Sequence, residues 1–561
     1  MALLMNQERN SANREWRKSM VYRLIFLMAP LALIVSSPVS AASSTAAAIQ
    51  ARIQTAVMKP NSQSFVTNVA DLRTFYEKRG FRPAWVGETR AGPRAREALA
   101  VIAGARIEGL NPNDYAVPEI DARMTPRTPD ERAVLELMLS SALADYGADL
   151  QSGRVAASAG NVGAKTYASM PRPQVSALLA SAQGARILSV YFAKLAPQSP
   201  RYRRLRGALA DYRKIARRGG WSAVSDGPSL RRGMTGNRVA ELRRRLATSN
   251  DYLKPLQGGA LFGRGLEAAV QRFQQRHGLA ADGIVGPRTR AALNVPVDHR
   301  LQQLRLNLER RRHLPADLGR RYIFVNTADF LLKLVDEEKT VLDMRVVVGT
   351  PYRRTPVFSA KMTYLEFNPF WNIPPRIARE EIVPRARRDP SHLLERGIRI
   401  FGGWSARAAE LPPGKVEWAN AENGHFPYRL RQDPGPRNPL GRVKFMFPNR
   451  FDVYLHDTPS RDLFDRDIRA FSHGCIRVEK PVVLAAYLLR PNGDWPEVRV
   501  REIMEAAKTR RVLLARPVPV HVTYLTAWVN KDGSVHFRKD IYGRDRLLTA
   551  TLKRSSHAPT P

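Results

Sequence analysis

The spacing of apolar residues along the chain separates two kinds of structure. Over residues 61–220 apolar side chains recur every three or four positions, and the run from Glu131 to Leu150 places them on one helical face. Residues 229–295 keep this period in shorter stretches that end at glycines or turns. We therefore predict a helical scaffold domain over 61–220 and a small domain of three short helices over 229–295. Residues 43–60 are expected to be a loose linker.

From Tyr322 onward, short runs rich in β-branched and aromatic residues replace the helical period. Runs of this kind, bounded by turn residues, cover 322–326, 345–349, 443–447 and 451–455. The segment 368–375 is too rich in proline for a central strand, so we expect a loop or an edge there.

A long insertion interrupts the strands. Residues 376–440 are rich in Arg, Pro and Gly, and an insertion of this length in a sheet domain is usually a functional lid or a separate subdomain. We predict a mostly-β domain over 321–517 with this insertion as its lid. The tail, 518–561, carries a strand-like run, an Asp532-Gly533 turn and a second short run, which predicts a hairpin added to this mostly-β domain. The fold class expected for the whole chain is multidomain α+β.

The formal net charge of +39 calls for an anionic partner or surface. Nucleic acid is the first candidate, but the Arg and Lys residues are scattered, and the sequence has no zinc-finger spacing, no RNA-binding aromatic signature and no basic region joined to heptads. We therefore expect no nucleic-acid partner. A basic proteome, or attraction to an acidic envelope polymer, explains the charge better.

The N-terminus resembles an export signal. Basic residues precede an apolar run from Leu24 to Val35, and Val39-Ser40-Ala41 offers a small-residue cleavage site. We predict a signal peptide over residues 1–42, with Met1 or Met20 as the start. The alternative is an uncleaved membrane anchor. Either reading places most of the chain outside the cytoplasm.

The candidate chemistry centres on Cys475, the only cysteine of the chain. A lone thiol in an exported protein is an oxidation liability, so its presence needs a reason, and catalysis is one. Cys475 follows Ser472-His473-Gly474 and precedes Arg477, while His456 ends a predicted strand. A neighbouring imidazole can convert a thiol into the nucleophilic thiolate.

The residues around the thiol suggest the other parts of a reactive site. The backbone amides of Gly474 and Cys475 could form an oxyanion hole. Arg477 adds positive potential, which would lower the thiol pKa, and could bind a substrate carboxylate. The alternative for Cys475 and His456 is a buried small hydrophobe and an ordinary hydrogen-bonded histidine. No metal and no cofactor is expected, because His456 and His473 lack a third ligand at a recognisable spacing.

These residues carry a family resemblance. His456 and Ser472-His473-Gly474-Cys475-Ile476-Arg477 resemble the signature of YkuD-type L,D-transpeptidases, and 229–295 resembles the peptidoglycan-binding domain found beside many wall enzymes. With the helical region and the insertion, the chain is similar to the large, YcbB-like periplasmic members. The resemblance implies a periplasmic enzyme of cell wall biogenesis and cell shape. Its fold would combine a helical scaffold, a three-helix binding domain and a mostly-β catalytic domain.

The resemblance also implies roles for single residues. Cys475 would attack the carbonyl of the third residue of a stem peptide, and His456 would be the base, oriented by the backbone carbonyl of Asp457. His473 and Gly474 would lie at the oxyanion hole. The remaining candidates are expected to contact substrate: Arg477, Ser472, Tyr454, Asn368 and Trp371.

The acceptor is what the resemblance leaves open. A diaminopimelate amine of a second tetrapeptide stem would give a cross-link, water would give an L,D-carboxypeptidase, and a protein lysine would give an attachment enzyme. A non-catalytic wall-binding scaffold is the alternative outside enzymes, and a cysteine protease lacks the local signatures of those families. The expected partners are peptidoglycan tetrapeptide stems, carbapenem-type inhibitors and other envelope enzymes.

Overall fold

A computed structural model describes residues 44–58, 69–155, 172–252, 260–418 and 426–555. The predicted signal peptide lies outside these residues. Within the described ranges, no helix combines the length and the apolar character needed to cross a membrane.

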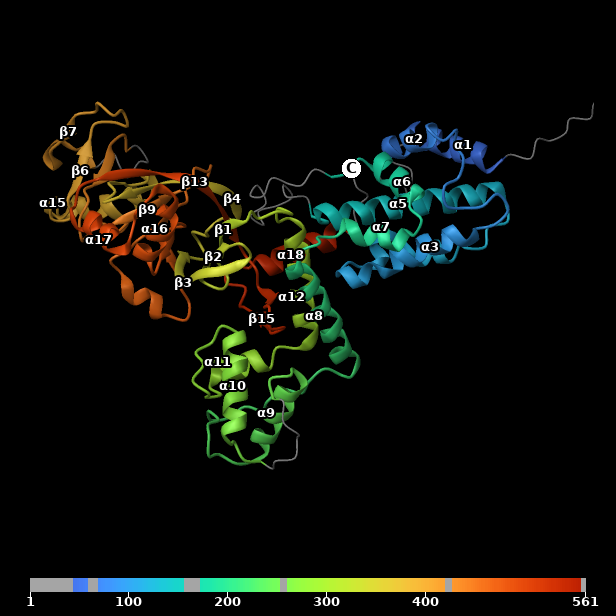
Figure 1. The fold of residues 1–561 in the computed structure, drawn as a ribbon, viewed down its shortest axis with the longest axis horizontal. Coiled ribbons are helices and arrows are strands. Elements are labelled where there is room, and N and C mark those ends of the chain that lie inside the picture. The colour runs from blue at the N-terminus through green and yellow to red at the C-terminus, as the bar shows by residue number, and fades with distance from the viewer. Residues whose placement is uncertain (1–43, 59–68, 156–171, 253–259, 419–425, 556–561) are drawn as a thin grey trace, which may run out of the picture. The chain divides into compact units, whose positions relative to one another are not determined.

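The N-terminal region is helical and is built around one long buried helix, α5 (Pro129–Ser152). Thr128 and Glu131 form a capping box at its start, which satisfies backbone N–H groups that the first turn leaves unpaired. Neighbouring helices contact α5 on several sides (Figure 1): α1 (Thr45–Met58), α3 (Gly92–Ala103), α6 (Val175–Gly184), α7 (Leu188–Leu195) and α12 (Val297–Arg312). Three more helices complete the region: α2 (Val69–Glu77), α4 (Val117–Asp121) and α8 (Pro200–Arg217).

The linker expected over residues 43–60 was wrong, because α1 occupies most of it. Ile49 and Ile53 are separated by one helical turn and are both buried against the scaffold core. The segment is rich in alanine, the residue with the highest helix propensity.

The next domain is small and has its own core. It contains α9 (Asn237–Thr248), α10 (Arg264–Arg276) and α11 (Pro287–Leu293), as the glycine-punctuated pattern predicted. The apolar residues at helical spacing in α9 and α10, among them Val239, Leu242, Val270 and Phe273, are fully buried in this core.

The C-terminal half is organised by a nine-stranded sheet. Its order is β11-β3-β12-β10-β9-β4-β13-β1-β2, and β2 also pairs with β3, so that the sheet closes on itself. The strands are β1 (Arg321–Asn326), β2 (Leu331–Asp336), β3 (Lys339–Gly349), β4 (Phe358–Phe367), β9 (Val443–Met446), β10 (Leu455–His456), β11 (Ala470–Ser472), β12 (Ile476–Val478) and β13 (Arg510–Thr523). Its core also includes side chains of α16 (Pro481–Leu489) and α17 (Glu497–Glu505). The predicted α+β fold class is confirmed.

One predicted strand, 451–455, is much shorter in the structure. β10 contains only Leu455 and His456, because Asp452 has a positive φ of 52° that breaks the extended backbone. The Asn449 amide bridges the carbonyls of Phe447 and Val453, which closes the preceding residues into a turn.

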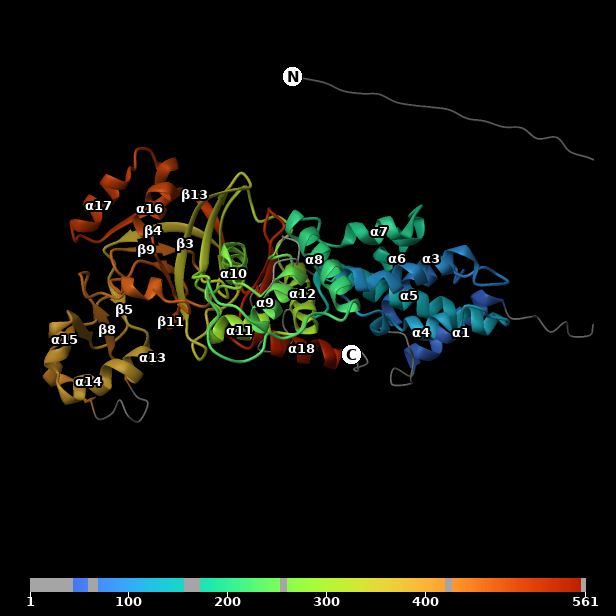
Figure 2. The same cartoon turned by 90° about the horizontal axis from the view of Figure 1, so that it is seen from below.

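The insertion forms a separate subdomain with its own core and a four-stranded sheet of order β5-β8-β6-β7 (Figure 2). Its strands are β5 (Trp371–Asn372), β6 (Ile398–Phe401), β7 (Glu410–Leu411) and β8 (Arg429–Gln432), and its helical segments are α13 (Pro375–Ile377), η3 (Ala378–Ile382), α14 (Val383–Arg388) and α15 (Ser391–Glu395).

The C-terminal tail differs from the predicted hairpin in its first arm. The run from Val518 belongs to β13, which lies inside the central sheet between β4 and β1. The hairpin consists instead of β14 (Ala527–Val529) and β15 (Val535–Phe537), and its apolar residues join the core of the helical region. The last helix is α18 (Arg544–Ser555). The sequence of a strand does not reveal which other strand it pairs with. For this reason the run from Val518 was wrongly assigned to a hairpin.

Candidate active site

The candidate nucleophile and base lie on one face of two neighbouring strands. β10 and β12 run parallel with Leu455 opposite Ile476, and both of these side chains are fully buried in the core of the sheet. Because side chains alternate along a strand, the residues that flank this pair share the other face: Tyr454, His456, Cys475 and Arg477. Cys475 is therefore the diagonal neighbour of His456, at a Cα separation of about 7–8 Å on a sheet face.

His456 is built to act as a neutral base. Its ring is 4% exposed, and Nδ1 lies 2.6 Å from the backbone carbonyl oxygen of Asp457, the contact that the family resemblance implied. Burial, and then the positive charges of Arg477 and Lys444, lower the pKa of His456 to about 3. With its proton on Nδ1, the imidazole keeps Nε2 as an acceptor.

Asp457 is itself fixed from several sides. Its carboxylate accepts hydrogen bonds from the backbone N–H of Arg442 at 2.8 Å and from the Arg461 guanidinium at 2.6 Å. Gly441 packs directly against this carboxylate with a φ of 63°. The carbonyl that orients His456 therefore belongs to a residue with little freedom to move.

Cys475 is partly exposed and protonated at rest. Its Sγ–H donates to the carbonyl of Asp452, with 3.7 Å between sulfur and oxygen. Burial raises the pKa of the thiol, against hydrogen bonds from Tyr454 and the nearby Lys444 ammonium, which lower it. Arg477 was expected to lower the pKa of the thiol, but burial raises this pKa instead. The resting pair is a neutral thiol beside a neutral imidazole, so the thiol proton must move as the sulfur attacks.

Ser472 and Gly474 shape the loop that carries the thiol. The Ser472 hydroxyl donates to the Cys475 carbonyl at 2.5 Å and accepts from the Gly474 N–H at 3.1 Å, while Thr355 donates to the Gly474 carbonyl at 2.8 Å. The Gly474 amide is therefore already used within the loop and is not available for an oxyanion hole. Gly474 has a φ of 126°, which glycine adopts without strain. Ser472 braces this loop and is buried away from any ligand.

His473 contacts the insertion. Its Nε2 forms a short hydrogen bond with the Glu381 carboxylate of η3. Arg353, from the loop after β3, donates to the same carboxylate at 2.7 Å and also pairs with Glu380. This group of charged side chains, His473, Arg353, Glu380 and Glu381, joins the insertion to the thiol loop, and we call it the clasp.

The predicted substrate residues divide into two groups. Tyr454 and Arg477 lie beside the reacting pair, and the Arg477 Nε is buried with no hydrogen-bond partner in the described part of the chain. Asn368 and Trp371 lie elsewhere. Asn368 is 1% exposed and its amide donates to the carbonyls of Ile503 and Lys508, so it packs the sheet against α17. Trp371 belongs to the core of the insertion.

Sequence reasoning missed residues that the structure brings to the site. The Asp452 carbonyl accepts a hydrogen bond from the thiol, Lys444 lies opposite His456 on β9, and Glu381 binds His473. For Lys444 a signal existed, since the alternation of the 443–447 run already placed it on the face away from Val443 and Phe445. For Glu381 none existed, because nothing local connects it with a residue 92 positions away.

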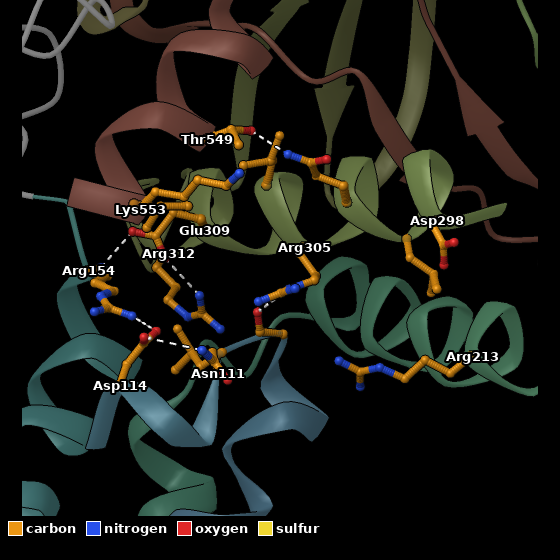
Figure 3. Close-up of a pocket in the computed structure, with 16 residues that line it drawn as sticks. Asn111, Asp114, Arg154, Arg213, Asp298, Arg305, Glu309, Arg312, Thr549 and Lys553 are labelled. Carbon is orange, nitrogen blue, oxygen red and sulfur yellow. Dashed lines mark hydrogen bonds and ion pairs between the residues drawn. The ribbon is translucent and has the colours of Figure 1, made fainter. Parts of the chain in front are cut away.

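Outside this site, neither a metal-ligand cluster nor the cavity at α12 points to a second reaction centre in the described chain. No cluster of His, Cys, Asp or Glu suited to a metal ion occurs in these residues. A cavity of about 510 Å³ lies where α12, α18 and the helical region meet, and many of its charged groups bond to one another or to the backbone (Figure 3). There Arg154 pairs with Asp114, Arg312 donates to Glu309, and Arg305 donates to the Gly109 carbonyl. The cavity is a polar junction between structural elements, and its lining includes no thiol or imidazole.

Comparisons with known families agree with this site. Residues 320–512 match the family described as "L,D-transpeptidase catalytic domain", residues 235–293 match "Putative peptidoglycan binding domain", and residues 70–209 match "Scaffold domain". A curated protein of Haemophilus influenzae named "Putative L,D-transpeptidase" is 38% identical over 247 residues, which cover 44% of this chain and 49% of that protein. The chain thus spans about half the length of the curated relative.

Solved structures show weaker likenesses. An L,D-transpeptidase from Xylanimonas cellulosilytica is 16% identical with a TM-score of 0.15, covering 53% of this chain and 99% of that one. Another from Stackebrandtia nassauensis is 16% identical with a TM-score of 0.21, covering 56% and 100%. At these scores the family assignment rests on the sequence matches alone. By these sequence matches, residues 320–512 are similar to the catalytic domain of YkuD-type L,D-transpeptidases, beside segments similar to a peptidoglycan-binding domain and a scaffold domain.

Proposed function

We propose that the chain is a cysteine acyltransferase, an L,D-transpeptidase that cross-links diaminopimelate residues of peptidoglycan stem peptides. The observation that carries the proposal is the shared sheet face of Cys475 and His456. The Asp457 carbonyl occupies Nδ1 of the imidazole and leaves Nε2 for the thiol proton. This is the arrangement that an acyl-enzyme mechanism requires, a nucleophile beside a base that a third group orients.

Acylation of the enzyme would begin with transfer of the thiol proton from Sγ to Nε2 of His456 as sulfur attacks the carbonyl of the third stem residue. The new S–C bond gives a tetrahedral intermediate. When that intermediate collapses, the bond to the terminal D-alanine breaks, and the imidazolium returns its proton to the leaving amine. Burial and the adjacent Arg477 and Lys444 charges make the imidazolium short-lived, which favours rapid return of the proton.

Transfer to the acceptor would repeat these steps in reverse order. A diaminopimelate amine of a second stem attacks the thioester, His456 takes the proton from this amine, and the thiol is regenerated with the proton returned to sulfur. The product is an amide bond between the third residues of two stems. The match of residues 235–293 to a peptidoglycan-binding domain supports a polymeric wall substrate, and we place the reaction in the periplasm.

The acceptor distinguishes this function from its alternatives. Water at the same thioester would make the enzyme an L,D-carboxypeptidase, and a protein lysine would make it an attachment enzyme. The chain's nucleophile and base are the same in all three cases. Separation of the muropeptides formed from purified tetrapeptide-rich peptidoglycan would identify the product. We expect dimers linked between third residues to exceed the tripeptides that hydrolysis releases.

The first experiment is intact-mass measurement after exposure to a carbapenem, whose strained amide resembles the acyl donor. We expect one adduct per chain on the wild type and none on Cys475→Ala. Lys361→Gln is the matched control, since Lys361 is exposed on β4. A folded wild-type protein that forms no adduct and releases no D-alanine from a tetrapeptide would contradict the proposal and favour a non-catalytic wall-binding scaffold.

A further inference from the structure

The face of the sheet that carries the reacting pair continues far beyond it. Strand register places one row of polar side chains across β12, β10, β9, β4 and β13, with His456 opposite Lys444, Lys444 opposite Glu366, and Glu366 opposite Arg511. With Arg477 at its start, the row crosses four interstrand spacings, about 19 Å in all. We call these five residues, Arg477, His456, Lys444, Glu366 and Arg511, the polar row.

A second row runs beside the polar row and begins at the nucleophile. Cys475 is followed across the strands by Tyr454, Met446, Tyr364 and Leu513. Most residues of both rows are partly or fully exposed, whereas the opposite face of the same strands is buried in the core. The thiol therefore lies at one end of an open surface that combines aromatic side chains with charge.

Lys444 is the cation of this surface nearest to the reacting pair on the side away from Arg477. Its Nζ lies 4.2 Å from the centroid of the Tyr454 ring. Across the sheet, Tyr454 lies between Cys475 and β9, the strand that carries Lys444. In the described part of the chain Lys444 forms no ion pair. Burial lowers the pKa of Lys444, and the negative charge of Glu366 opposes this effect. Lys444 is thus a partly buried ammonium beside the nucleophile that forms no salt bridge with the described carboxylates.

The two cations that flank His456 suit a donor with a carboxylate on each side of the bond that breaks. Arg477 lies on one side of the imidazole and Lys444 on the other. A tetrapeptide donor carries one carboxylate on its leaving D-alanine. Another lies at the far end of the diaminopimelate side chain, on the acyl side of the bond that breaks. One cation cannot pair well with both groups, because they lie on opposite sides of the bond that breaks.

We propose that Lys444 is a carboxylate-binding residue of the donor site, which holds the side-chain carboxylate of the diaminopimelate whose carbonyl Cys475 attacks. The assignment rests on the transpeptidase function proposed above. Glu366, the next residue of the polar row, lies on the far side of Lys444, where its charge opposes the effect of burial on the Lys444 pKa. Lys444 would thereby select diaminopimelate over lysine at the third position of the stem, since lysine lacks this carboxylate.

Two donors test the proposal: tetrapeptides that end in D-alanine and carry either diaminopimelate or lysine as the third residue. D-alanine release is followed with hydroxylamine as the common acceptor. The wild type should prefer the diaminopimelate donor about tenfold in kcat/KM, the effect expected for one charged hydrogen bond. Lys444→Gln should abolish this preference, lowering kcat/KM for the diaminopimelate donor about tenfold relative to the lysine donor, on which any loss reports only the charge beside His456 and Cys475. Lys444→Arg should restore part of the preference, and Lys361→Gln, which removes one positive charge from an exposed position on β4, should behave as wild type.

Other results would overturn the assignment. Equal losses on both donors, with slower alkylation of Cys475 by iodoacetamide, would mean that Lys444 acts on the thiol and not on the substrate. No change on either donor would mean that Lys444 has no role in binding. Carbapenem acylation shows whether only the Lys444 assignment is wrong or the proposed transpeptidase function is wrong as well. A wild type that forms the adduct but shows no donor preference rejects the Lys444 assignment alone, whereas a wild type that forms no adduct and releases no D-alanine rejects both.

Discussion

The two histidines of the site are held in opposite ways. His456 lies in a sheet whose register fixes its neighbours, its ring is buried, and its partner is a backbone carbonyl. His473 is exposed, and its partner is the Glu381 carboxylate of the inserted subdomain. One histidine is thus fixed by many cooperative contacts, and the other by a single group of charged side chains.

The difference in energy between these regions is large. Side chains of the clasp are 21–40% exposed, and ion pairs with this much solvent contribute about 0–1 kcal/mol each. Burial of an aliphatic side chain of the sheet contributes about 1.5–3 kcal/mol. Movement of the insertion therefore costs little compared with distortion of the strands. We infer that the sheet fixes the reactive geometry, whereas the clasp controls what reaches it.

Removal of the base should produce the largest effect. His456→Ala should lower the rate of Cys475 acylation by about 10³-fold, because it removes the neighbouring base that takes the thiol proton in the proposed mechanism. His473→Ala should lower the acylation rate far less, since His473 belongs to the clasp. Carbapenem acylation followed by mass spectrometry measures both, and circular dichroism confirms that the variants are folded. Similar losses for the two variants would remove the distinction between the regions.

A smaller effect should follow from displacement of the residue that orients His456. Gly441→Ala would put a Cβ atom 2.4 Å from the Asp457 Cγ at a position where φ is 63°. We expect a lower melting temperature, from strain of about 1–3 kcal/mol, and about a tenfold loss of acylation rate as the Asp457 carbonyl moves.

The matched control for this change lies in the insertion. Gly403→Ala would meet no atom within 4 Å and requires no unusual backbone angle, so it should leave both the melting temperature and the rate unchanged. If Gly441→Ala kept the wild-type rate while it lowered the melting temperature, the tight packing around Asp457 would serve stability alone.

The protonation of His456 predicts how stability depends on pH. Its pKa is about 3 in the folded protein and has an ordinary value of 6.5, so between these pH values the unfolded chain binds more protons. Stability contributed by this residue is therefore complete above pH 6.5 and is lost as pH falls toward 3. In urea titrations His456→Asn should show a weaker decline over this window than the wild type. Equal declines would mean that the imidazole is solvated and not buried.

The sequence predicted those parts of the site that depend on local order. Cys475 and His456 were identified because a short motif and a strand end place them, and the Asp457 carbonyl followed from the same motif. Asn368 was wrongly expected to contact substrate, because the sequence cannot show that a polar amide turns inward to bind the backbone of α17. Lys444 became visible only when the register of β9 and β10 was known. Pairing between distant strands is not encoded within either strand, and this is also why β13 was mistaken for part of a hairpin.

The smallest effect is expected at the clasp itself. Glu381→Gln removes the charge that faces His473 and Arg353, and because these side chains are exposed, the melting temperature should change by at most a few degrees. Acylation by a bulky carbapenem should become faster by about twofold to fivefold, which corresponds to a barrier lowered by less than about 1 kcal/mol.

The wild-type rate should rise toward that of the variant as salt is added, because screening weakens the same contacts. Glu395→Gln, an exposed change on α15, serves as the control and should show neither effect. A Glu381→Gln rate that equals the wild-type rate at every salt concentration would show that the clasp does not limit access, and that the insertion is as fixed as the sheet.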